Sequence, residues 1–569
     1  MCSSCRTPLP WLLAGLSLGL ASLCAPDTAR AQEVPPVVLV GRAVNAQRMP
    51  IDGLQARLLA DGEPIGQTCR TRADGWFVIE LPGDAPLSGK LSLQLQRRHF
   101  ESRTLEIDEA SLRALRSGRA ASLGYVTVAR RRTAAFWITL LVFVFMMVLV
   151  GITAVHNALA ALLGASALLA TSALGHLFNP DLIVYGFGEA ISSIDWNVVF
   201  LIMGMMIVIA VVEGTGVFRW LAFFAYKASG GKIWKLMLIL MVLTAVSSAV
   251  LDNVTTMLLV APITIRIALA MRIDPLTLLM PEVLAANAGG LSTMVGTPTN
   301  ILIASYSGIS FSDFLLNLTP GVLLALAGIA AYCLLRYRKH FAAAGAMSDE
   351  LYERLKQGAV IAQPAHLKKA GWVGLGMLLL FILGELLHLP PAVIALMGAT
   401  CLLAWIRPDI EEMIEAVDWT TLVFFITLFM VVGALQEVGL IDLLAQGVSY
   451  LVGSNRILAM LVLTWMAALI STVIPNIPFT ATMLPVVGFL TASIPDADPQ
   501  SLYFCLAVGS AMGGNGSLIG ASANLVTAGI AERAGHPITF GHFFKLGFPA
   551  LLVSVALAFA WLLIRYLAF

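Results

Sequence analysis

The chain has 569 residues, of which 58% are hydrophobic and 12% are charged, and its mean hydropathy is +0.86. Soluble domains carry about 25% charged residues, so this composition excludes an ordinary soluble protein and predicts several membrane-spanning segments. The formal net charge of +1 and the lack of a basic cluster argue against a nucleic-acid partner. The seven cysteines include no C-x-x-C pair near histidines, which argues against a zinc or disulfide framework.

The N-terminus has the layout of an export signal. Arg6 precedes the apolar residues 11–25, and Ala29-Arg30-Ala31 forms an A-x-A cleavage site. We therefore predict a signal peptide at residues 1–31, with an uncleaved anchor as the alternative. Leu23 is too bulky to precede a lipidated Cys24. In either case, the segment that follows lies outside the cytoplasm.

Residues 33–130 are predicted to form a small extracytoplasmic β-sandwich domain. Short alternating stretches are separated by turn pairs such as Asp61-Gly62 and Asp74-Gly75. The string GRAVNAQRMPIDGLQARLL, followed by TRADGWFVIELP, resembles carboxypeptidase-regulatory-like domains. This segment contains no constellation of metal ligands or nucleophiles. Two roles stay open for it, namely a stabilising appendage and a binding domain. The expected strands are 37–44, 54–59, 76–81, 91–95 and 125–128.

From residue 136 onward, nearly the whole chain is apolar enough for a membrane. Two stretches, 233–272 and 456–491, are too long for one helix and have polar residues midway, so we predict that each is a re-entrant hairpin. The predicted fold is an all-α polytopic membrane protein after the β domain. The predicted crossings are 136–153, 157–177, 197–216, 280–306, 317–336, 371–388, 391–406, 419–437, 500–531 and 546–567.

The positions of the basic residues orient these crossings. With residue 130 outside, loops 217–235, 337–370, 407–418 and 532–545 lie in the cytoplasm. Of the 18 Lys and Arg beyond residue 133, 16 fall in these loops or on adjacent cytoplasmic ends, and only Arg456 and Arg565 do not. This positive-inside asymmetry predicts a bacterial-type inner (plasma) membrane protein whose residues 33–130 are periplasmic or extracellular.

The membrane sequence repeats itself. Asp195-Trp196 recurs as Asp418-Trp419, 223 positions later, and five predicted crossings separate the two. An odd number of crossings inverts the second copy, which is the architecture of many secondary transporters. We predict repeats at 136–336 and 371–569, joined by a cytoplasmic linker at 337–370. Further pairs at an offset of 223 or 224 are Gly216 with Gly439, Asn253 with Asn476, Pro262 with Pro485, Gly289-Gly290 with Gly513-Gly514, Gly296 with Gly520, and Asn300 with Asn524.

Each repeat contains two polar interruptions of its apolar sequence, one in the hairpin and one in a helix. Glycine and proline break these helices, and the freed backbone groups need partners that lipid does not supply. Carbonyl, amide and hydroxyl oxygens can coordinate a cation, and half-helix N-termini can attract an anion. Such residues also serve simply to join helices. The four interruptions are centred on Asp252-Asn253, Gly296-Thr297-Pro298, Pro475-Asn476 and Gly520-Ala521-Ser522.

Asp252 is the carboxylate of greatest interest, because a buried acid in a membrane is costly and usually faces a cavity or a partner. We predict that it coordinates a cation or exchanges a proton. It can also cap the second limb of the hairpin, and the two roles are compatible. By contrast, Glu213, Glu282 and Glu385 are interpreted as interfacial or helix-terminal groups.

The motifs LDNVTTMLLVAPITIR, NAGGLSTMVGTPTNILI and GGNGSLIGASANLVTAGIAE resemble the ArsB/NhaD/P-protein permeases of the ion transporter superfamily, which are related to the divalent-anion/sodium symporters. The likeness covers about residues 136–569. It implies a scaffold and a moving transport domain, commonly as a homodimer, and it leaves a separate ATPase partner open. The family pattern G-D-P-P-N is altered here, with Thr297 and Thr299 in place of the Asp and the second Pro.

Carried over from the resemblance, the first ion site consists of Asp252, Asn253, Thr255, Gly296 and Asn300, with Thr297 beside it. Sodium is expected at Asp252, Asn253, Gly296 and Asn300. The substrate is expected between the two halves. The second site consists of Asn476, Thr480, Gly520, Ser522 and Asn524.

Three functions are compatible with these features. The leading hypothesis is a secondary transporter of a small anion or oxyanion, such as arsenite or a carboxylate, coupled to sodium or protons. The second is a sodium/proton antiporter, and the third is a membrane receptor that senses a ligand through the β domain. The sequence contains no enzyme constellation, no cofactor motif and no G-x-x-x-x-G-K-[ST] loop for ATP.

Overall fold

The computed structural model describes residues 37–45, 48–81, 90–152, 155–341, 353, 356–357, 361–494 and 498–567. The chain divides into two compact units, Met1–Arg131 and Arg132–Phe569. The predicted signal segment, with Arg6, Cys24 and its A-x-A site, lies outside the described residues. So does part of the predicted linker 337–370.

The first unit is a two-layered β structure. Its sheets have the strand orders β4-β1-β7 and β3-β2-β5-β6. Alternate residues of β4 are buried, and Leu39, Phe77, Leu58 and Leu93 from both sheets share one hydrophobic core. The strands are β1 (Val37–Val44), β2 (Gln55–Ala60), β3 (Glu63–Arg70), β4 (Trp76–Leu81), β5 (Leu91–Gln96), β6 (Arg103–Glu106) and β7 (Ala121–Thr127), with helix α2 (Glu109–Arg116) before β7.

Five of these strands lie where the alternating stretches predicted strands, although β7 begins four residues earlier than expected. The sequence did not predict β3, β6 or α2. Asp61 and Gly62 form the predicted turn, with φ values of 49° and 92°, and the turn leads directly into β3. Pro64 and Gly66 depress the strand propensity of β3, so its pairing with β2 comes from the tight turn rather than from an apolar pattern.

The second unit is helical throughout. The first repeat begins with long apolar helices, continues with a helical hairpin and a broken helix, and ends with one long helix. These elements are α3 (Ala134–Gly151), α4 (Asn157–Leu177), η1 (Pro180–Leu182), α5 (Phe187–Ser192), α6 (Trp196–Gly214), α7 (Val217–Ser229), the hairpin α8 (Ile233–Ser248) and α9 (Asn253–Ala270), the broken helix α10 (Leu276–Gly290) and α11 (Pro298–Ser307), and α12 (Phe311–Phe341).

The second repeat has the same order of elements. They are α14 (Pro364–Leu387), α15 (Pro391–Ile406), α16 (Ile410–Glu415), α17 (Trp419–Val438), α18 (Leu440–Val452), the hairpin α19 (Arg456–Ile470) and α20 (Asn476–Ser493), the broken helix α21 (Ser501–Gly513), η2 (Gly514–Gly516) and α22 (Ser522–Arg533), and α23 (Phe540–Leu567).

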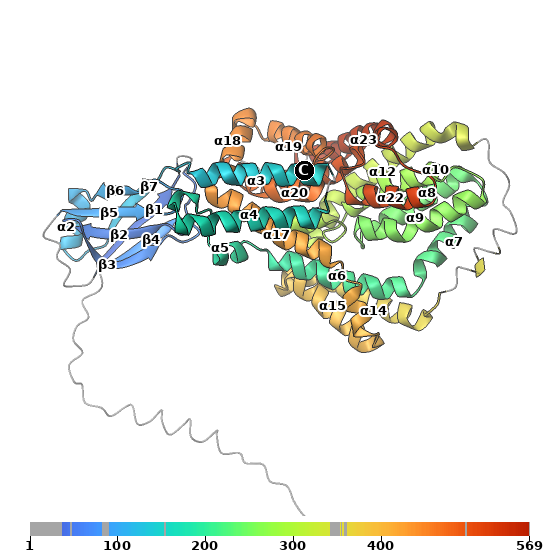
Figure 1. Cartoon of the computed structure of the whole chain (residues 1–569), viewed down its shortest axis with the longest axis horizontal. Coiled ribbons are helices and arrows are strands. Elements are labelled where there is room, and N and C mark those ends of the chain that lie inside the picture. Colours follow the sequence, from blue (N-terminus) through green and yellow to red (C-terminus); the bar gives the residue numbers. More distant parts are fainter. Residues whose placement is uncertain are drawn as a thin grey trace, which may run out of the picture. The chain divides into compact units, whose positions relative to one another are not determined.

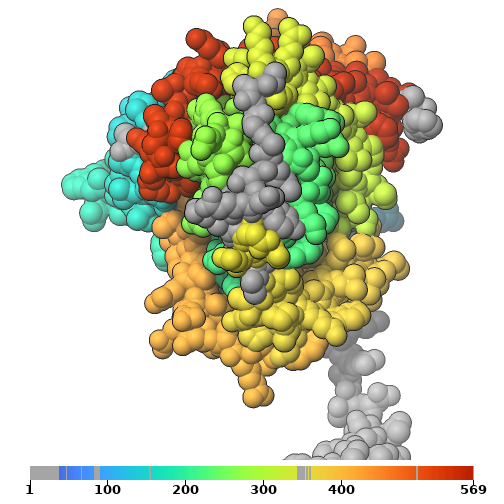
Figure 2. Space-filling model, turned by 90° about the vertical axis from the view of Figure 1, so that its right-hand side faces the viewer, coloured from blue at the N-terminus to red at the C-terminus, as the bar shows by residue number. Residues whose placement is uncertain are grey.

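Packing follows this internal symmetry. Helix α4 of the first repeat packs on α17 of the second, and α15 of the second packs on α6 of the first. Within each repeat, the first hairpin limb packs on the broken helix, as α8 on α10 and α19 on α21. Between the repeats, α12 packs on α23 (Figure 1). Segments of the first repeat (green) and of the second (orange to red) also share the face of the unit drawn in Figure 2.

Among the described residues, nine helices are long and apolar enough to cross a membrane, and α9 and α20 of the hairpins are two of them. The predicted fold class is therefore confirmed: an inverted-repeat membrane protein with two hairpins and two broken helices, preceded by a small β region. The sequence missed α7 and α18, which begin directly after Gly216 and Gly439. These glycines have φ values of 79° and 86°, so each repeat turns sharply at the same point.

Beyond residue 133, the two basic residues that break the positive-inside pattern lie near one another in the fold. Arg456 donates to the backbone oxygen of Tyr566, and Arg565 donates to Asn317 Oδ1 at 2.9 Å. Both charges are thus held by hydrogen bonds at the junction of α19, α12 and α23. Their placement serves helix packing, which explains why they depart from the rule for free loop charges.

Candidate functional site

One cavity of about 680 Å³ touches all four interruptions. Asp252 lies at the start of α9, Pro298 at the start of α11, Pro475 next to the start of α20, and Ser522 at the start of α22, and all four line this cavity. The N-terminal ends of four helices from both repeats therefore converge on one space. Side chains of α4, α6 and α17 form the facing wall.

Asp252 caps the hairpin limb α9. Its Oδ1 accepts from the backbone N–H of Thr255 at 2.7 Å, and its Oδ2 accepts from the Thr255 hydroxyl at 2.9 Å. The capping role that the sequence predicted is therefore present, and the carboxylate still lines the cavity. Asp252 is in position both to fix the tip of the hairpin and to contact a bound ion.

In the first broken helix, Asn300 organises the unwound segment between α10 and α11. Its Nδ2 lies 2.7 Å from the oxygen of Thr293, 3.2 Å from that of Leu291 and 3.3 Å from that of Gly290. Thr297 caps α11, because its hydroxyl accepts from the backbone N–H of Asn300. The carbonyls that the helix break releases are thus satisfied by the amide of Asn300.

The second broken helix repeats two of these hydrogen bonds. Asn524 Nδ2 donates to the oxygens of Gly514 at 2.7 Å and Ser517 at 2.8 Å, which correspond to Gly290 and Thr293 in the first repeat. The match between the two repeats therefore extends from sequence to the hydrogen bonds of these two asparagines.

A second set of matched contacts joins each hairpin tip to its broken helix. The Ser248 hydroxyl donates to the Ala286 oxygen at 2.8 Å, and its counterpart Ser471 donates to the Ser510 oxygen at 3.0 Å. Likewise, Thr293 donates to Ala249, and Ser517 donates to Thr472. Each hairpin is therefore joined to its broken helix by hydrogen bonds from two hydroxyls that occupy equivalent positions in the two repeats.

Glycines allow these segments to approach closely. An added Cβ at Gly296 would lie 2.5 Å from the Gly290 oxygen and 2.7 Å from the Ser248 oxygen. At the equivalent Gly520 it would lie 2.9 Å from the Ser471 oxygen. Backbone carbonyl oxygens therefore crowd around both glycines, and no other residue leaves room for them.

The predicted site residues fall into two groups. Asp252, Thr255 and Ser522 line the cavity. The others are buried and do not line it, and among them Thr480 Oγ1 and Asn300 Oδ1 have no hydrogen-bond partner. The buried group consists of Asn253, Gly296, Thr297, Asn300, Asn476, Thr480, Gly520 and Asn524.

Two asparagines that the sequence did not single out connect the repeats. Asn287 Oδ1 accepts from Asn253 Nδ2 at 2.9 Å, and Asn287 Nδ2 donates to Asn524 Oδ1 at 2.9 Å and to Asn515 Oδ1 at 3.0 Å. Both residues lie within the family motifs. A search for residues repeated at the common offset cannot find them, because their counterparts are Ala511 and Leu291.

The cavity also contains titratable residues outside the predicted set. His156, Glu213 and Asp418 line it together with Asp252, and the lining residues in the described part of the chain include no Lys or Arg. Glu213 is near the end of α6, as predicted, yet it faces the cavity. Asp418 caps α17 through the backbone N–H groups of Thr420 and Thr421.

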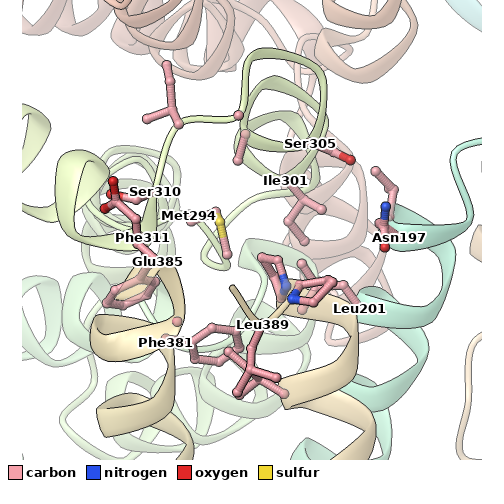
Figure 3. A pocket seen from close by; sticks show the side chains of 18 of the residues that line it. Asn197, Leu201, Met294, Ile301, Ser305, Ser310, Phe311, Phe381, Glu385 and Leu389 are labelled. Atoms are coloured by element: carbon pink, nitrogen blue, oxygen red, sulfur yellow. The ribbon is translucent and has the colours of Figure 1, made fainter. Parts of the chain in front are cut away.

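A second cavity, of about 420 Å³, lies between α6, α11, α12, α14 and α15 (Figure 3). Met294 and Ile301 lie near the centre of the view, and Glu385 enters from α14. Ile301 lines both cavities, so it belongs to the partition between them. Ser305 of α11 donates to Asp195, the cap of α6, and its counterpart in the second repeat is Gly529.

The interpretation of Glu282 as an interfacial or helix-terminal group is wrong. Its side chain is 0% exposed within α10, with Oε1 2.8 Å from the Thr264 hydroxyl and Oε2 without a partner. A charged carboxylate in that position would be strongly penalised, so the buried group is expected to be neutral.

This neutrality predicts that Glu282→Gln keeps the stability of the protein within about 1 kcal/mol, because the amide still accepts from Thr264. Glu282→Lys is expected to lower stability by more than about 3 kcal/mol, because it places an unpaired charge in the same packed position. Thermal unfolding of the purified variants in one detergent measures both. Equal losses for Gln and Lys would contradict a neutral Glu282.

Within the described residues, no group of three or more His, Cys, Asp or Glu side chains comes together to hold a metal ion. The oxygens available to a cation near the hairpin tips are therefore amide, hydroxyl and carbonyl oxygens, with Asp252 as the nearby acid. Oxygen donors of this kind suit hard cations.

Comparison with known proteins places this geometry in context. Residues 146–509 match the model of the citrate transporter family, CitMHS. A 46 kDa membrane protein of Mycobacterium leprae is 36% identical over 431 residues, covering 76% of this chain and 99% of the relative. An uncharacterised transporter of Mycobacterium tuberculosis is 38% identical over 428 residues, covering 75% of this chain and 97% of the relative. The human P protein is 33% identical over 492 residues, covering 72% of this chain and 58% of the relative.

Two solved transporters have a related fold. The YdaH transporter of Alcanivorax borkumensis has a TM-score of 0.50 at 17% identity, covering 72% of this chain and 98% of its own. MtrF of Neisseria gonorrhoeae has a TM-score of 0.51 at 12% identity, covering 72% of this chain and 95% of its own. At these identities, the likeness shows the fold alone.

Proposed function

The chain belongs to the citrate transporter family, and from that premise we propose that it is a secondary transporter of a small carboxylate-type anion, coupled to sodium or protons. The observation that carries the proposal is the single cavity on which two capped and two uncapped helix N-termini converge, with Asp252 at its edge. This arrangement suits an anion and a cation bound side by side.

The second repeat supplies the anion side. Helices α20 and α22 have no side-chain cap at their N-termini, and Ile477 and Ser522 at those ends line the cavity. Exposed N–H groups and the partial positive charge of a helix N-terminus attract carboxylates. A carboxylate substrate would therefore bind at α20 and α22, while its methylene groups contact the apolar wall.

The first repeat supplies the cation side. Asp252 and Thr297 cap α9 and α11, which occupies the positive ends of these helices with side-chain oxygens. Asp252 adds a negative charge at the cavity, and the buried Asn300 Oδ1 of the first broken helix has no hydrogen-bond partner. A sodium ion or a proton bound there would offset the charge of Asp252 and favour an incoming anion, and that mutual dependence is the basis of coupled transport.

The cavity extends to His156 before α4, Glu213 near the end of α6 and Asp418 before α17. The positions of Lys and Arg predict that these helix ends face the cytoplasm. We therefore propose that this conformation faces the cytoplasm, and that the cavity beyond Ile301 lies on the outer half of the route. The transport cycle would alternate between the two sides.

A sodium/proton antiporter is the alternative, and one observation favours it. The lining residues include three carboxylates, Glu213, Asp252 and Asp418, and, among the described residues, no Lys or Arg that could pair with an anion. Arsenite, or another oxyanion of the kind carried by ArsB/NhaD-type permeases, is a further substrate to test. We also propose a homodimer, as the resemblance to these permeases implies, and a partner ATPase would appear as ATP-dependent uptake.

Reconstitution in proteoliposomes distinguishes the anion transporter from the sodium/proton antiporter. Purified protein should accumulate labelled citrate, or a shorter di- or tricarboxylate, when an inward sodium or proton gradient is imposed. Uptake of arsenite is measured in parallel under the same gradients. Discharge of a pH gradient by sodium alone, with no carboxylate or arsenite uptake under any gradient, would establish the antiporter and overturn the anion proposal.

Deletion of residues 33–130, with the signal retained, separates the transporter from a receptor that senses ligand through the β domain. Each unit has its own core, so we expect the remaining chain to insert and to keep at least about half of the citrate uptake per molecule. Uptake normalised to the amount of protein in the membrane measures this. Complete loss of transport from well-inserted protein would make the β domain part of the transport mechanism.

A further inference from the structure

The two ion sites that the repeats imply are not equivalent, and the difference lies in one pair of oxygens. Asn300 and Asn524 occupy matched positions and donate to matched carbonyls. In the second repeat, Asn524 Oδ1 accepts from Asn287 Nδ2 at 2.9 Å. In the first repeat, Asn300 Oδ1 is fully buried and has no partner.

The orientation of the Asn287 amide is determined by its neighbours. Asn524 Nδ2 faces two backbone oxygens, those of Gly514 and Ser517, so the other atom of this amide must be its oxygen. Only an N–H group can face that oxygen, which fixes the nitrogen of Asn287 towards Asn524. The remaining Asn287 oxygen then accepts from Asn253. An exchanged assignment would place two oxygens against each other.

The sequence explains why only one of the two asparagine oxygens, Asn524 Oδ1, accepts a hydrogen bond from an amide. At the offset that pairs Asn300 with Asn524, the counterpart of Asn287 is Ala511, which is buried in α21 and carries no donor. Helices α10 and α22 contact each other, as do α21 and α11. The same position of the fold therefore presents an amide to the second repeat and a methyl group to the first.

Backbone oxygens gather at the helix break that contains Gly296 and Asn300. Backbone oxygens of Gly290 and Ser248 crowd around Gly296, where an added Cβ would lie within 2.5 and 2.7 Å of them. Asp252, the residue directly before Asn253 at the tip of the same hairpin, lines the adjoining cavity and provides the negative charge. A hard cation such as sodium takes oxygen ligands of this kind, and Asn300 Oδ1, which has no hydrogen-bond partner, is free to be one of them.

We propose that the protein couples transport to a single cation, bound beside Asn300 in the first repeat, and that the Asn287 amide replaces the cation in the second repeat. This inference rests on the proposed function for its role in coupling, but the cation count can be measured without transport. The donated N–H of Asn287 supplies the partial positive charge that Asn524 would otherwise take from an ion.

Equilibrium binding of radioactive sodium to the purified full-length protein tests the inference, alongside thermal stabilisation by sodium. Wild type is expected to bind one sodium per chain with a Hill coefficient of about 1. Asn287→Ala should free Asn524 Oδ1 and raise the count to two. Ala511→Asn should place an amide opposite Asn300 and abolish binding, as should Asn300→Ala. The exposed Asn179→Ala serves as a control and should bind one sodium.

Two sodium ions per wild-type chain, or none at any pH, would overturn the inference, and so would an unchanged count in well-folded Asn287→Ala. If that variant does not fold, Ala511→Asn and Asn300→Ala decide the question, because retained sodium binding in both would place the cation elsewhere. One sodium bound without uptake of any carboxylate under any gradient would instead overturn the proposed function and leave the single cation site standing.

Discussion

Replacement of Gly296 by alanine is expected to abolish transport and to destabilise the membrane unit by about 3 kcal/mol or more. The new Cβ would lie 2.5 Å from the Gly290 oxygen and 2.7 Å from the Ser248 oxygen, and neither backbone atom can rotate away as a side chain would. Overpacking of a fixed core typically costs about 1–3 kcal/mol, and here the contacts are with polar backbone atoms at the proposed ion site. Substrate uptake and thermal unfolding measure the two effects.

The repeat supplies matched controls for this variant. Gly520→Ala should show a smaller loss of stability, because its nearest contact, the Ser471 oxygen, is at 2.9 Å. Gly374→Ala in α14 should be neutral or slightly stabilising, since no atom lies within 4 Å and alanine favours a helix by about 1 kcal/mol. Wild-type uptake and stability in Gly296→Ala would show that the close approach of the carbonyls is not needed.

Asp252→Asn is expected to reduce coupled transport by about 10²-fold or more while leaving the fold intact. Asparagine still caps α9, since its side-chain oxygen can accept from the Thr255 N–H, but it lacks the negative charge that lines the cavity. Loss of one partner of a buried charge interaction costs about 2–5 kcal/mol, and each 1.4 kcal/mol corresponds to a factor of ten.

A matched control for this change is Asp409→Asn, which substitutes the cap of the short helix α16 away from the cavity and should transport normally. Initial rates of uptake over a range of sodium concentrations and pH values distinguish a weakened cation site from a lost substrate site. Full activity of Asp252→Asn at every sodium concentration and pH would remove Asp252 from the coupling mechanism.

The sequence predicted the elements that depend on local patterns. Long apolar runs marked the crossings, and the helix breaks at Gly296-Thr297-Pro298 and Gly520-Ala521-Ser522 marked where the backbone unwinds. Asn300 and Asn524 were found because both repeats carry them, and repetition in an inverted pair implies convergence. The assignment of ligands to these residues stays a prediction, although their neighbours Pro298 and Ser522 line one cavity.

Other features could not be predicted because they are long-range or asymmetric. Asn287 and Asn515 meet across 228 positions of sequence, and neither has a repeated partner. Glu282 is buried only because surrounding helices cover every side of α10, which hydropathy around a single residue does not reveal. His156 and Asp418 reach the cavity from helix ends that read as ordinary loop and capping positions.

The bridge from Asn287 to Asn524 has an evolutionary consequence. If the ancestor was a dimer of identical subunits, its symmetry would have treated the oxygens at the positions of Asn300 Oδ1 and Asn524 Oδ1 alike. Both would have accepted an amide, or both would have bound a cation, so these two sites together would have held two cations or none. Only after gene duplication and fusion could the two halves mutate independently, so that Asn287 and Ala511 came to differ. An odd number of bound cations would thus be a property that fusion made available, and one that a symmetric homodimer could not reach with these two sites.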